Sequence, residues 1–545
     1  MSQQTLLRST GVMAAGTFVS RVLGFVRASL LSGLLGITGF LAADAFVTAN
    51  TVPNQIYNLI AGGLLNAVLV PQITRAARHE DGGQAFLDRL LTLALLVLAA
   101  VTVLAVLLAP LVPVVLKPSG SVPWDAATRN LCVAFAVWCL PQVFFYGMYT
   151  VLGQVLNAAG RFGAYMWAPV ANNVVAIVGL LVMLATIGEA SRSNPHEPAG
   201  WTGGEIAVLA GTATLGVVVQ ALVLLVPLRR IGFRYRPRLG LRGVGLGTAG
   251  RVAGWTFAAA VVGQLGFIVT VKAVNAGGAG GGPGQNAYGN SFLLFMLPHS
   301  LVTVSLVTAL FTRISRAAAE DDLPGVRRDL SVGLRLTGVA TVLALTAMLA
   351  VGPDLTRTLF WKNSTAETDA VAWATMAMML GLVSFSAQYL FQRVFYALED
   401  ARTPFLIQLP VVGTIALTSY LSGVLLDPAH VVRGIALGMA AGYTVGAVLS
   451  AVLLHRRLGS LDGSRVLRTY VRLTVAAVPA GVLGWAVSRG VHAVLGEGLL
   501  GHLVALVLGG LVVLVAYIGA CRAMRVTELD DVAGPLLRRL PLRRK

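Results

Sequence analysis

Residues 20–71 read SRVLGFVRASLLSGLLGITGFLAADAFVTANTVPNQIYNLIAGGLLNAVLVP, two helix-length apolar runs that also carry charged and amide side chains. Arg21 and Arg27 interrupt the first run, and Asp44 lies in the second. A charge in the hydrocarbon core costs about 2.5–3.5 kcal/mol even on a lenient insertion scale, so it normally faces an aqueous cavity or a partner. The two runs therefore predict membrane-spanning helices that line a polar route.

Amides recur every four residues along the second run, at Asn50, Asn54, Asn58 and, after a glycine, Asn66. Residues four apart lie on one face of a helix, so these side chains form a single stripe. Pro53 falls inside the same run and predicts a kink there. Arginines that face an amide stripe across a bent helix are suited to an anionic ligand.

The predicted substrate site consists of Arg21, Arg27, Asp44, Asn54 and Asn58. We expect Arg21 to hold a phosphate-like group through its planar guanidinium. Arg27 and Asp44 are expected to form an ion pair that opens and closes with conformation, and the two asparagines to line the cavity. The alternatives are that the arginines snorkel or fix helix packing, that the Asp44 carboxylate is solvated, and that the amides only hydrogen-bond between helices.

The composition is that of a membrane protein with many spans. Hydrophobic residues make up 56% of the 545 residues and charged residues 12%, against about 25% charged in globular proteins, and the mean hydropathy is +0.78. About 20 apolar residues cross a bilayer. We predict an all-α polytopic fold with 14 transmembrane helices, at residues 10–36, 41–74, 90–116, 127–157, 163–187, 205–228, 249–275, 287–312, 332–360, 371–397, 403–426, 432–454, 470–489 and 499–521.

The net charge of +18 is concentrated in alternate loops. Arginines gather at 229–242, 313–328, 456–468 and in the tail LLRRLPLRRK, whereas the intervening loops are almost bare. Basic loops stay in the cytoplasm, so both termini are expected there. The excess of basic residues thus indicates the orientation of the chain in the membrane and contact with anionic lipid head groups. No nucleic-acid partner is expected.

The chain contains an internal repeat. Ile73–Ala77 reads ITRAA and Ile314–Ala318 reads ISRAA, while Pro169 aligns with Pro410 at the same offset. Such a parallel duplication is typical of transporters whose route lies between the two halves. We predict two pseudo-symmetric six-helix lobes, an N-lobe at 1–230 and a C-lobe at 231–456, then a helix pair at 457–525 and a basic cytoplasmic tail at 526–545.

No spacing typical of an enzyme or of a bound cofactor is found. Cys132, Cys139 and Cys521 lie in or beside apolar runs, without metal-ligand spacing, and are expected to be small core residues. No catalytic triad, metal cluster or phosphate-binding loop is evident in the sequence. We therefore expect a transporter without a cofactor, with a coupling cation or the membrane potential both open as energy sources. His299, after Pro298, is expected to pack or to sense protons.

Several motifs together resemble the MurJ/MviN family of the multidrug/oligosaccharidyl-lipid/polysaccharide (MOP) exporter superfamily: SRVLGFVR at 20–27, ADAFVTANTVPN at 43–54, VLNAAGRF at 155–162, APVANN at 168–173 and YALEDARTP at 396–404. This resemblance implies a fourteen-helix flippase of the bacterial cytoplasmic membrane. Such a flippase moves lipid II, the undecaprenyl-diphosphate-linked peptidoglycan precursor, to the outer leaflet by alternating access. It also implies that the family's cavity arginines map onto Arg21 and Arg27 and its aspartate onto Asp44, with the polyprenyl tail along the last two helices.

Other substrates and partners are left open by the sequence. A flippase for another polyprenyl-diphosphate-linked glycan would need the same cationic cavity. A MATE-like cation-coupled antiporter would need buried acids, and Asp44 stands nearly alone beside two arginines. The expected partners are lipid II, membrane lipids, and cell-wall synthesis or division proteins.

Overall fold

The computed structural model describes residues 3–60, 84–119, 122–233, 235–238 and 250–529. It divides into two compact units, residues 1–286 and 287–545. The described parts of both are built of helices and the turns between them, with no β-strand. The predicted all-α class is therefore confirmed.

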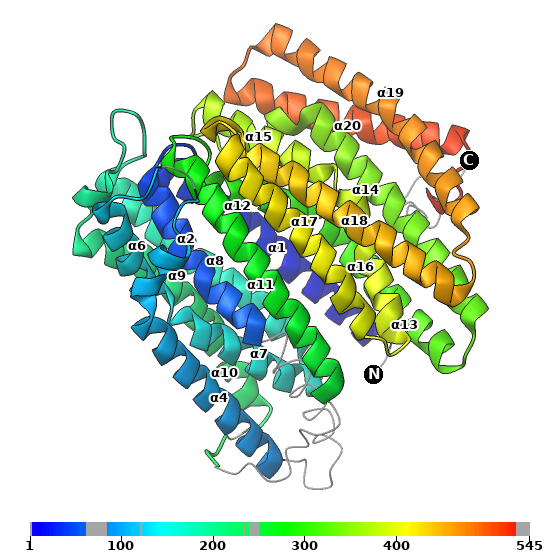
Figure 1. Ribbon diagram of the computed structural model, residues 1–545, viewed down its shortest axis with the longest axis horizontal. Helices are drawn as coiled ribbons and strands as arrows, with labels where there is room; N and C mark the ends of the chain where they lie inside the picture. The colour runs from blue at the N-terminus through cyan, green and yellow to red at the C-terminus, as the bar shows by residue number, and fades with distance from the viewer. Residues whose placement is uncertain (1–2, 61–83, 120–121, 234, 239–249, 530–545) are drawn as a thin grey trace. The chain divides into compact units, whose positions relative to one another are not determined.

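The first unit contains the helices from α1 to α11 (Figure 1). Their bounds are α1 (Gln3–Leu35), α2 (Leu41–Ile60), α4 (Gln84–Leu107), η2 (Ala109–Leu111), α5 (Val112–Val115), α6 (Ala126–Cys139), α7 (Gln142–Ala158), α8 (Phe162–Ile187), η3 (Pro198–Gly200), α9 (Gly203–Leu222), α10 (Leu225–Arg230) and α11 (Gly250–Ala279).

The second unit contains nearly all of α12 and the helices that follow it (Figure 1). Their bounds are α12 (Gln285–Pro298), the π-helical turn η4 (His299–Thr303), α13 (Val304–Ala319), α14 (Leu323–Leu359), α15 (Thr365–Met379), α16 (Leu382–Ala397), α17 (Arg402–Leu425), η5 (Pro428–His430), α18 (Val431–Leu458), α19 (Gly463–Leu495) and α20 (Leu499–Ala523).

Twelve spans among the described residues are long and apolar enough to cross a membrane, and α15 with α16, bent by 47°, makes a thirteenth. Each coincides with a predicted segment. Helix α2 begins at Leu41, as predicted, and the part of that segment beyond Ile60 lies outside the described residues. The protein is thus polytopic, and the count of fourteen stays a prediction.

The packing inside each unit follows from these spans. In the first, α1 packs along α8, and α11 packs against α2. In the second, α19 and α20 pack on each other and on α14. Because α11 contacts α2, the first unit extends to residue 286, whereas the predicted lobe boundaries at 230 and 456 stay predictions.

The sequence repeat has a counterpart in the way two helices are broken. Helix α6 ends at Cys139 and α7 begins at Gln142. Helix α15 ends at Met379 and α16 begins at Leu382, each 240 residues later. An interruption at the same place in both copies would not follow from apolar composition alone. It supports the duplication of this part of the chain.

The turns that follow these broken helices are also equivalent. After α7, Gly160 has a φ of +71° and the Arg161 N–H donates to the Leu156 carbonyl at 2.8 Å. After α16, Glu399 has a φ of +59° and the Asp400 N–H donates to the Phe395 carbonyl at 2.9 Å. Left-handed backbone costs an L-residue about 1–2 kcal/mol. The second copy therefore keeps the turn even without the glycine that favours it.

Close helix packing in the second unit depends on Gly381, at the break between α15 and α16. A methyl group there would lie 2.6 Å from the Cα atom of Ala440 in α18. Because backbone must shift to admit it, we expect Gly381→Ala to lower the free energy of unfolding by about 1–3 kcal/mol. Gly413→Ala, on an open face of α17, should be neutral or slightly stabilising. Thermal unfolding of both variants in detergent measures the difference, and equal melting temperatures would contradict it.

Asp400 links α17 to the end of α18. Its carboxylate accepts hydrogen bonds from the Thr403 N–H at 2.9 Å, the Thr403 hydroxyl at 2.7 Å and Arg457 at 2.8 Å. Partial burial raises the pKa of Asp400, but the Thr403 hydrogen bonds and the Arg457 charge lower it more, so the net pKa lies below its usual value. The folded state therefore favours the ionised carboxylate.

This shift predicts a pH-dependent stability. A depressed folded-state pKa contributes stability above the unfolded-state value of about 4, and that contribution disappears as the pH falls through the folded-state pKa. Asp400→Asn should melt below wild type at pH 7, by a margin worth at most about 1 kcal/mol for an exposed pair. The margin should vanish in acid. Asp427→Asn, an exposed residue before η5, is the control, and a margin constant down to pH 3 would refute the assignment.

Candidate functional site

The two arginines of α1 lie six residues apart, about 9 Å along the helix axis, and both are half-buried. Next to Arg21, the Asn173 side chain of α8 donates to the Ser20 carbonyl at 2.8 Å and so anchors this turn of α1. The electrostatic neighbours of Arg27 are the Tyr146 hydroxyl of α7 and the Cys139 thiol of α6. The guanidinium groups thus sit within the first unit, on a helix held in place by α8.

The amide stripe of α2 divides into two parts. Asn50 accepts a hydrogen bond at 3.0 Å from Gln142 of α7, which also donates to Thr214 of α9 at 3.0 Å. Asn54 and Asn58 are exposed in the unit. Asn50 therefore connects helices, whereas the two predicted cavity residues are accessible to a ligand. Asn66 lies outside the described residues.

Asp44 is buried, with only 2% of its surface exposed. Its Oδ1 accepts the N–H of Gln285, the first residue of α12, at 2.6 Å. A methyl group at Gly278 or Gly284 would overlap the carboxylate, so only glycine fits at either position. An anion at a helix N-terminus is favoured by the helix dipole. The geometry gives Asp44 a positioning role, because it fixes the start of α12 against α2.

The expected ion pair between Arg27 and Asp44 is not formed in this conformation of the described residues, because Asp44 binds the start of α12 instead. Neighbouring amides reinforce this junction. Asn275 of α11 donates to the Leu116 carbonyl at 2.7 Å, and Asn286 donates to the Gly36 carbonyl at 2.6 Å. A substrate contact of Asp44 stays a prediction.

Two polar contacts of α2 were missed at the sequence level. The Tyr57 hydroxyl lies 2.5 Å from the Thr150 hydroxyl of α7, and Gln264 of α11 donates to Gln55 at 3.2 Å. Both partners are more than 90 residues away in the chain, so no local pattern indicates them. They place polar groups beside the exposed asparagines.

The second unit contains an apolar groove between α14, α16 and α19, with a volume of about 490 Å³. Its walls include Leu349 of α14, Val383 of α16 and Trp485 of α19. Val478 and Val482 remain 63% and 59% exposed. This volume falls within the usual range of about 300–1,000 Å³ for ligand pockets, and the lining suits a hydrocarbon chain.

His299 is buried at the π-helical turn that follows Pro298. Its Nδ1 lies 3.1 Å from the Ser386 hydroxyl, and its ring packs 4.4 Å from that of Phe385, centroid to centroid. These contacts are those of a packed histidine with one hydrogen bond. Among the described residues, the His, Cys, Asp and Glu side chains close enough to share a metal ion are Asp354, His492 and His502.

A family model described as "Lipid II flippase MurJ" matches residues 32–508. The chain belongs to the MurJ lipid II flippase family. The lipid II flippase MurJ of Burkholderia cenocepacia is 27% identical over 494 residues, which cover 88% of this chain and 90% of that protein. A probable lipid II flippase MurJ of Rhizobium meliloti is also 27% identical, over 89% of this chain and 87% of that one.

Solved structures show the fold that the MurJ family shares with its neighbours. A lipid II flippase MurJ in an inward closed conformation matches with a TM-score of 0.70 at 16% identity, over 94% of this chain and 99% of that chain. An inward-facing MATE family transporter of the MOP superfamily matches with a TM-score of 0.65 at 16% identity, over 83% and 98%. The predicted family is confirmed by the family model, and these two structures show that the fold is shared.

The positioning role of Asp44 predicts a specific pattern of stability. Asp44→Ala leaves the Gln285 N–H without its acceptor and should lower the free energy of unfolding by about 1–3 kcal/mol. Asp44→Asn keeps a carbonyl oxygen and should lose less, while Asn58→Ala, exposed on the same helix, should lose almost nothing. Thermal unfolding in detergent measures all three, and an Asp44→Ala variant as stable as wild type would exclude the role.

Proposed function

We propose that the chain is a lipid II flippase, which carries the lipid-linked peptidoglycan precursor from the inner to the outer leaflet of the bacterial cytoplasmic membrane by alternating access. The observation that carries this proposal is the match of residues 32–508 to the lipid II flippase family. Relatives with that name align over 88% and 89% of this chain, so the proposal concerns nearly all of its length.

In this proposal Arg21 and Arg27 bind the diphosphate of the substrate. A guanidinium donates charge-assisted, bidentate hydrogen bonds to phosphate oxygens. Asn54 and Asn58, exposed on α2, supply amide donors and acceptors to the sugar–peptide head group. The two predicted lobes rock about this site, so that it opens alternately to the inner and the outer side of the membrane.

The polyprenyl tail would stay in an apolar environment throughout. The groove between α14 and α19 supports this part of the proposal, because its lining is almost entirely hydrocarbon and its volume is that of a binding pocket. The second unit would therefore supply the apolar surface for the tail.

Orientation and energy supply complete the proposal. Both termini lie in the cytoplasm, as the basic loops indicate, and the membrane potential or a coupling cation drives the cycle without a cofactor. Cell-wall synthesis and division proteins are the proposed protein partners. Another polyprenyl-diphosphate-linked glycan would satisfy the same arginines, so competition with such glycans measures the head-group preference.

Depletion of the protein in its own cells should cause lipid II to accumulate in the inner leaflet. A wild-type copy should reverse this, and Arg21→Ala should fail to, with a transport rate reduced about 10- to 100-fold, as expected for a lost charged hydrogen bond. Arg21→Lys keeps the charge but not the planar fork and should be intermediate. The readout is the leaflet distribution of lipid II at matched protein levels.

Arg316→Ala provides the control, since this arginine is exposed in the last turn of α13 and should rescue fully. If Arg21→Ala transported at the wild-type rate, the diphosphate site would be wrong. If depletion caused a different lipid-linked glycan to accumulate, the proposed substrate would be wrong while the site would stand.

A further inference from the structure

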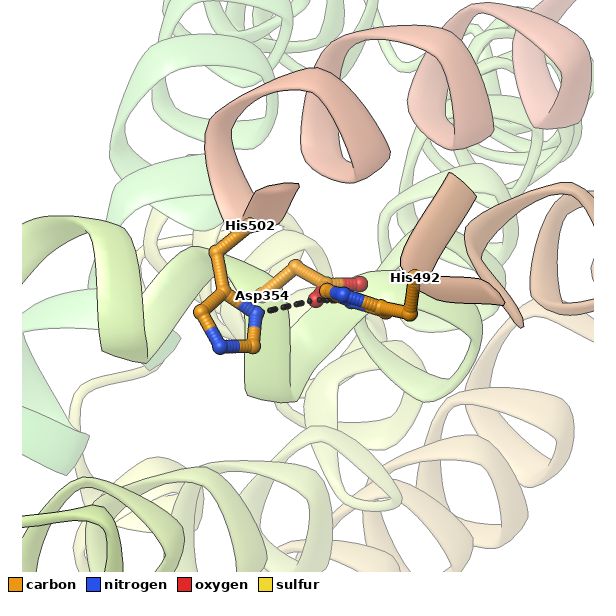
Figure 2. A group of neighbouring side chains, drawn as sticks. All are labelled: Asp354, His492 and His502. Atoms are coloured by element: carbon orange, nitrogen blue, oxygen red, sulfur yellow. Dashed lines mark hydrogen bonds and ion pairs between the residues drawn. The ribbon is translucent and has the colours of Figure 1, made fainter. Parts of the chain in front are cut away.

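Three helices of the second unit bring one carboxylate and two imidazoles together near their ends (Figure 2). Asp354 lies in α14, His492 in α19 and His502 in α20. Asp354 Oδ1 is 2.7 Å from His492 Nε2 and 2.9 Å from His502 Nδ1. The predicted orientation places these ends on the outer side of the membrane.

Local backbone features bring the cluster together. Helix α14 is interrupted at Val351, whose φ and ψ of −128° and 18° are not helical, and Pro353 follows immediately before Asp354. Gly484 of α19 and Gly509 of α20 allow their helices to approach closely, because a methyl group at either would lie within about 3 Å of the other's carbonyl oxygen. The three ligand atoms therefore lie within 4.8 Å of one another.

The hydrogen bonds around the cluster orient its ligand atoms. His492 Nδ1 is 3.0 Å from the Gly496 carbonyl oxygen, which can only accept, so this nitrogen carries the hydrogen. Nε2 faces the Asp354 carboxylate at 2.7 Å and carries a second hydrogen, and loss of that hydrogen leaves a neutral ring with its lone pair on Nε2. The Ser488 hydroxyl donates to Asp354 Oδ2 at 2.6 Å. The other oxygen, Oδ1, faces both imidazole rings. Such outer partners are what metal-ligating histidines and carboxylates usually have.

We propose that Asp354, His492 and His502 form a binding site for a divalent transition-metal ion of the Zn²⁺ class. Two imidazole nitrogens and one carboxylate oxygen, with a water in the fourth position, are a known zinc ligand set. The Asp354 and His502 side chains are each 6% exposed and that of His492 is 13% exposed, so the cluster is largely shielded and His492 is its most accessible member. A ligating ring nitrogen carries no hydrogen, so zinc binding displaces the hydrogens that His492 Nε2 and His502 Nδ1 direct at Asp354 when no ion is bound.

The two spacings between Asp354 Oδ1 and the ring nitrogens are close to those of a filled site. Tetrahedral zinc with ligand distances of about 2.0–2.1 Å separates its ligand atoms by about 3.3 Å. The contacts of 2.7 and 2.9 Å therefore lengthen by about half an ångström when an ion enters. The bound ion joins α14, α19 and α20 beyond the apolar groove, whose walls include Leu349 and Trp485, five and seven residues before Asp354 and His492.

The sequence did not indicate this site. His492 and His502 are 138 and 148 residues from Asp354 along the chain, and no short motif connects them. The prediction that no metal cluster is present was therefore based on local spacing alone, and the proposed site differs from it.

The test uses the full chain, purified in detergent, freed of any affinity tag and treated with EDTA. Titration calorimetry with Zn²⁺ should give one ion per chain, and Co²⁺ should produce the visible absorption of a nitrogen- and oxygen-liganded ion. His492→Gln keeps an amide that can donate to Asp354 but is a poor ligand, and its Zn²⁺ affinity should fall at least about 100-fold. Ser488→Ala, which removes an outer partner, should lose about 10-fold.

His430→Gln, an exposed histidine in η5, is the matched control and should bind like wild type. Zn²⁺ should also raise the melting temperature of wild type and of this control, but not that of His492→Gln. This measurement on wild type needs no variant to fold. If wild type takes up no Zn²⁺ after EDTA treatment, or if His492→Gln binds as tightly as wild type, the cluster is a hydrogen-bonded helix clamp and the proposal is wrong.

Discussion

A polar group inside a bilayer must find its partner within the protein, because no water is available in the hydrocarbon region. This constraint accounts for the arrangement of the first unit. Asp44 binds the start of α12, Asn275 binds the Leu116 carbonyl, and Asn172 donates to Gln220 at 2.8 Å. Each of these contacts joins segments that are far apart in the chain. The polar residues therefore determine which helices are neighbours, while the apolar residues determine only that helices form.

The same constraint distinguishes the exposed amides of α2 from those that join helices. Asn50 is engaged by Gln142, yet Asn54 and Asn58, one and two turns further along the same face, are exposed. An amide that only joined helices would be half-buried and hydrogen-bonded like Asn50. Within two turns, the amides of α2 therefore pass from a hydrogen-bonded position between helices to exposed positions. Pro53, which has no backbone N–H, lies where this change occurs.

Much of the fold could be predicted from the sequence, because apolar length sets the spans and the repeat sets the duplication. The equivalent breaks after Cys139 and Met379 were not predicted, since no residue type marks both. The role of Asp44 was also missed: its signals, Gly278 and Gly284, lie more than 230 residues away in a stretch that reads as a flexible loop. The cluster of Asp354, His492 and His502 was missed for the same reason. Local patterns predict helices, whereas sites depend on tertiary contacts.

The partners of the buried carboxylates indicate whether the ligand is a cation or an anion. The buried acidic side chains among the described residues each have a partner in the protein. Asp44 accepts from the Gln285 N–H, Asp88 from the Arg236 N–H, Asp329 pairs with Arg313, Asp354 contacts two histidines and Ser488, and Glu528 pairs with Arg335. A cation antiporter would need carboxylates that exchange their partners with its ligand, and breaking a buried charged contact costs about 3–5 kcal/mol. Helix α1 carries two half-buried guanidinium groups, those of Arg21 and Arg27. The charge that these side chains give α1 is positive, which is compatible with an anionic head group such as a diphosphate and not with an organic cation.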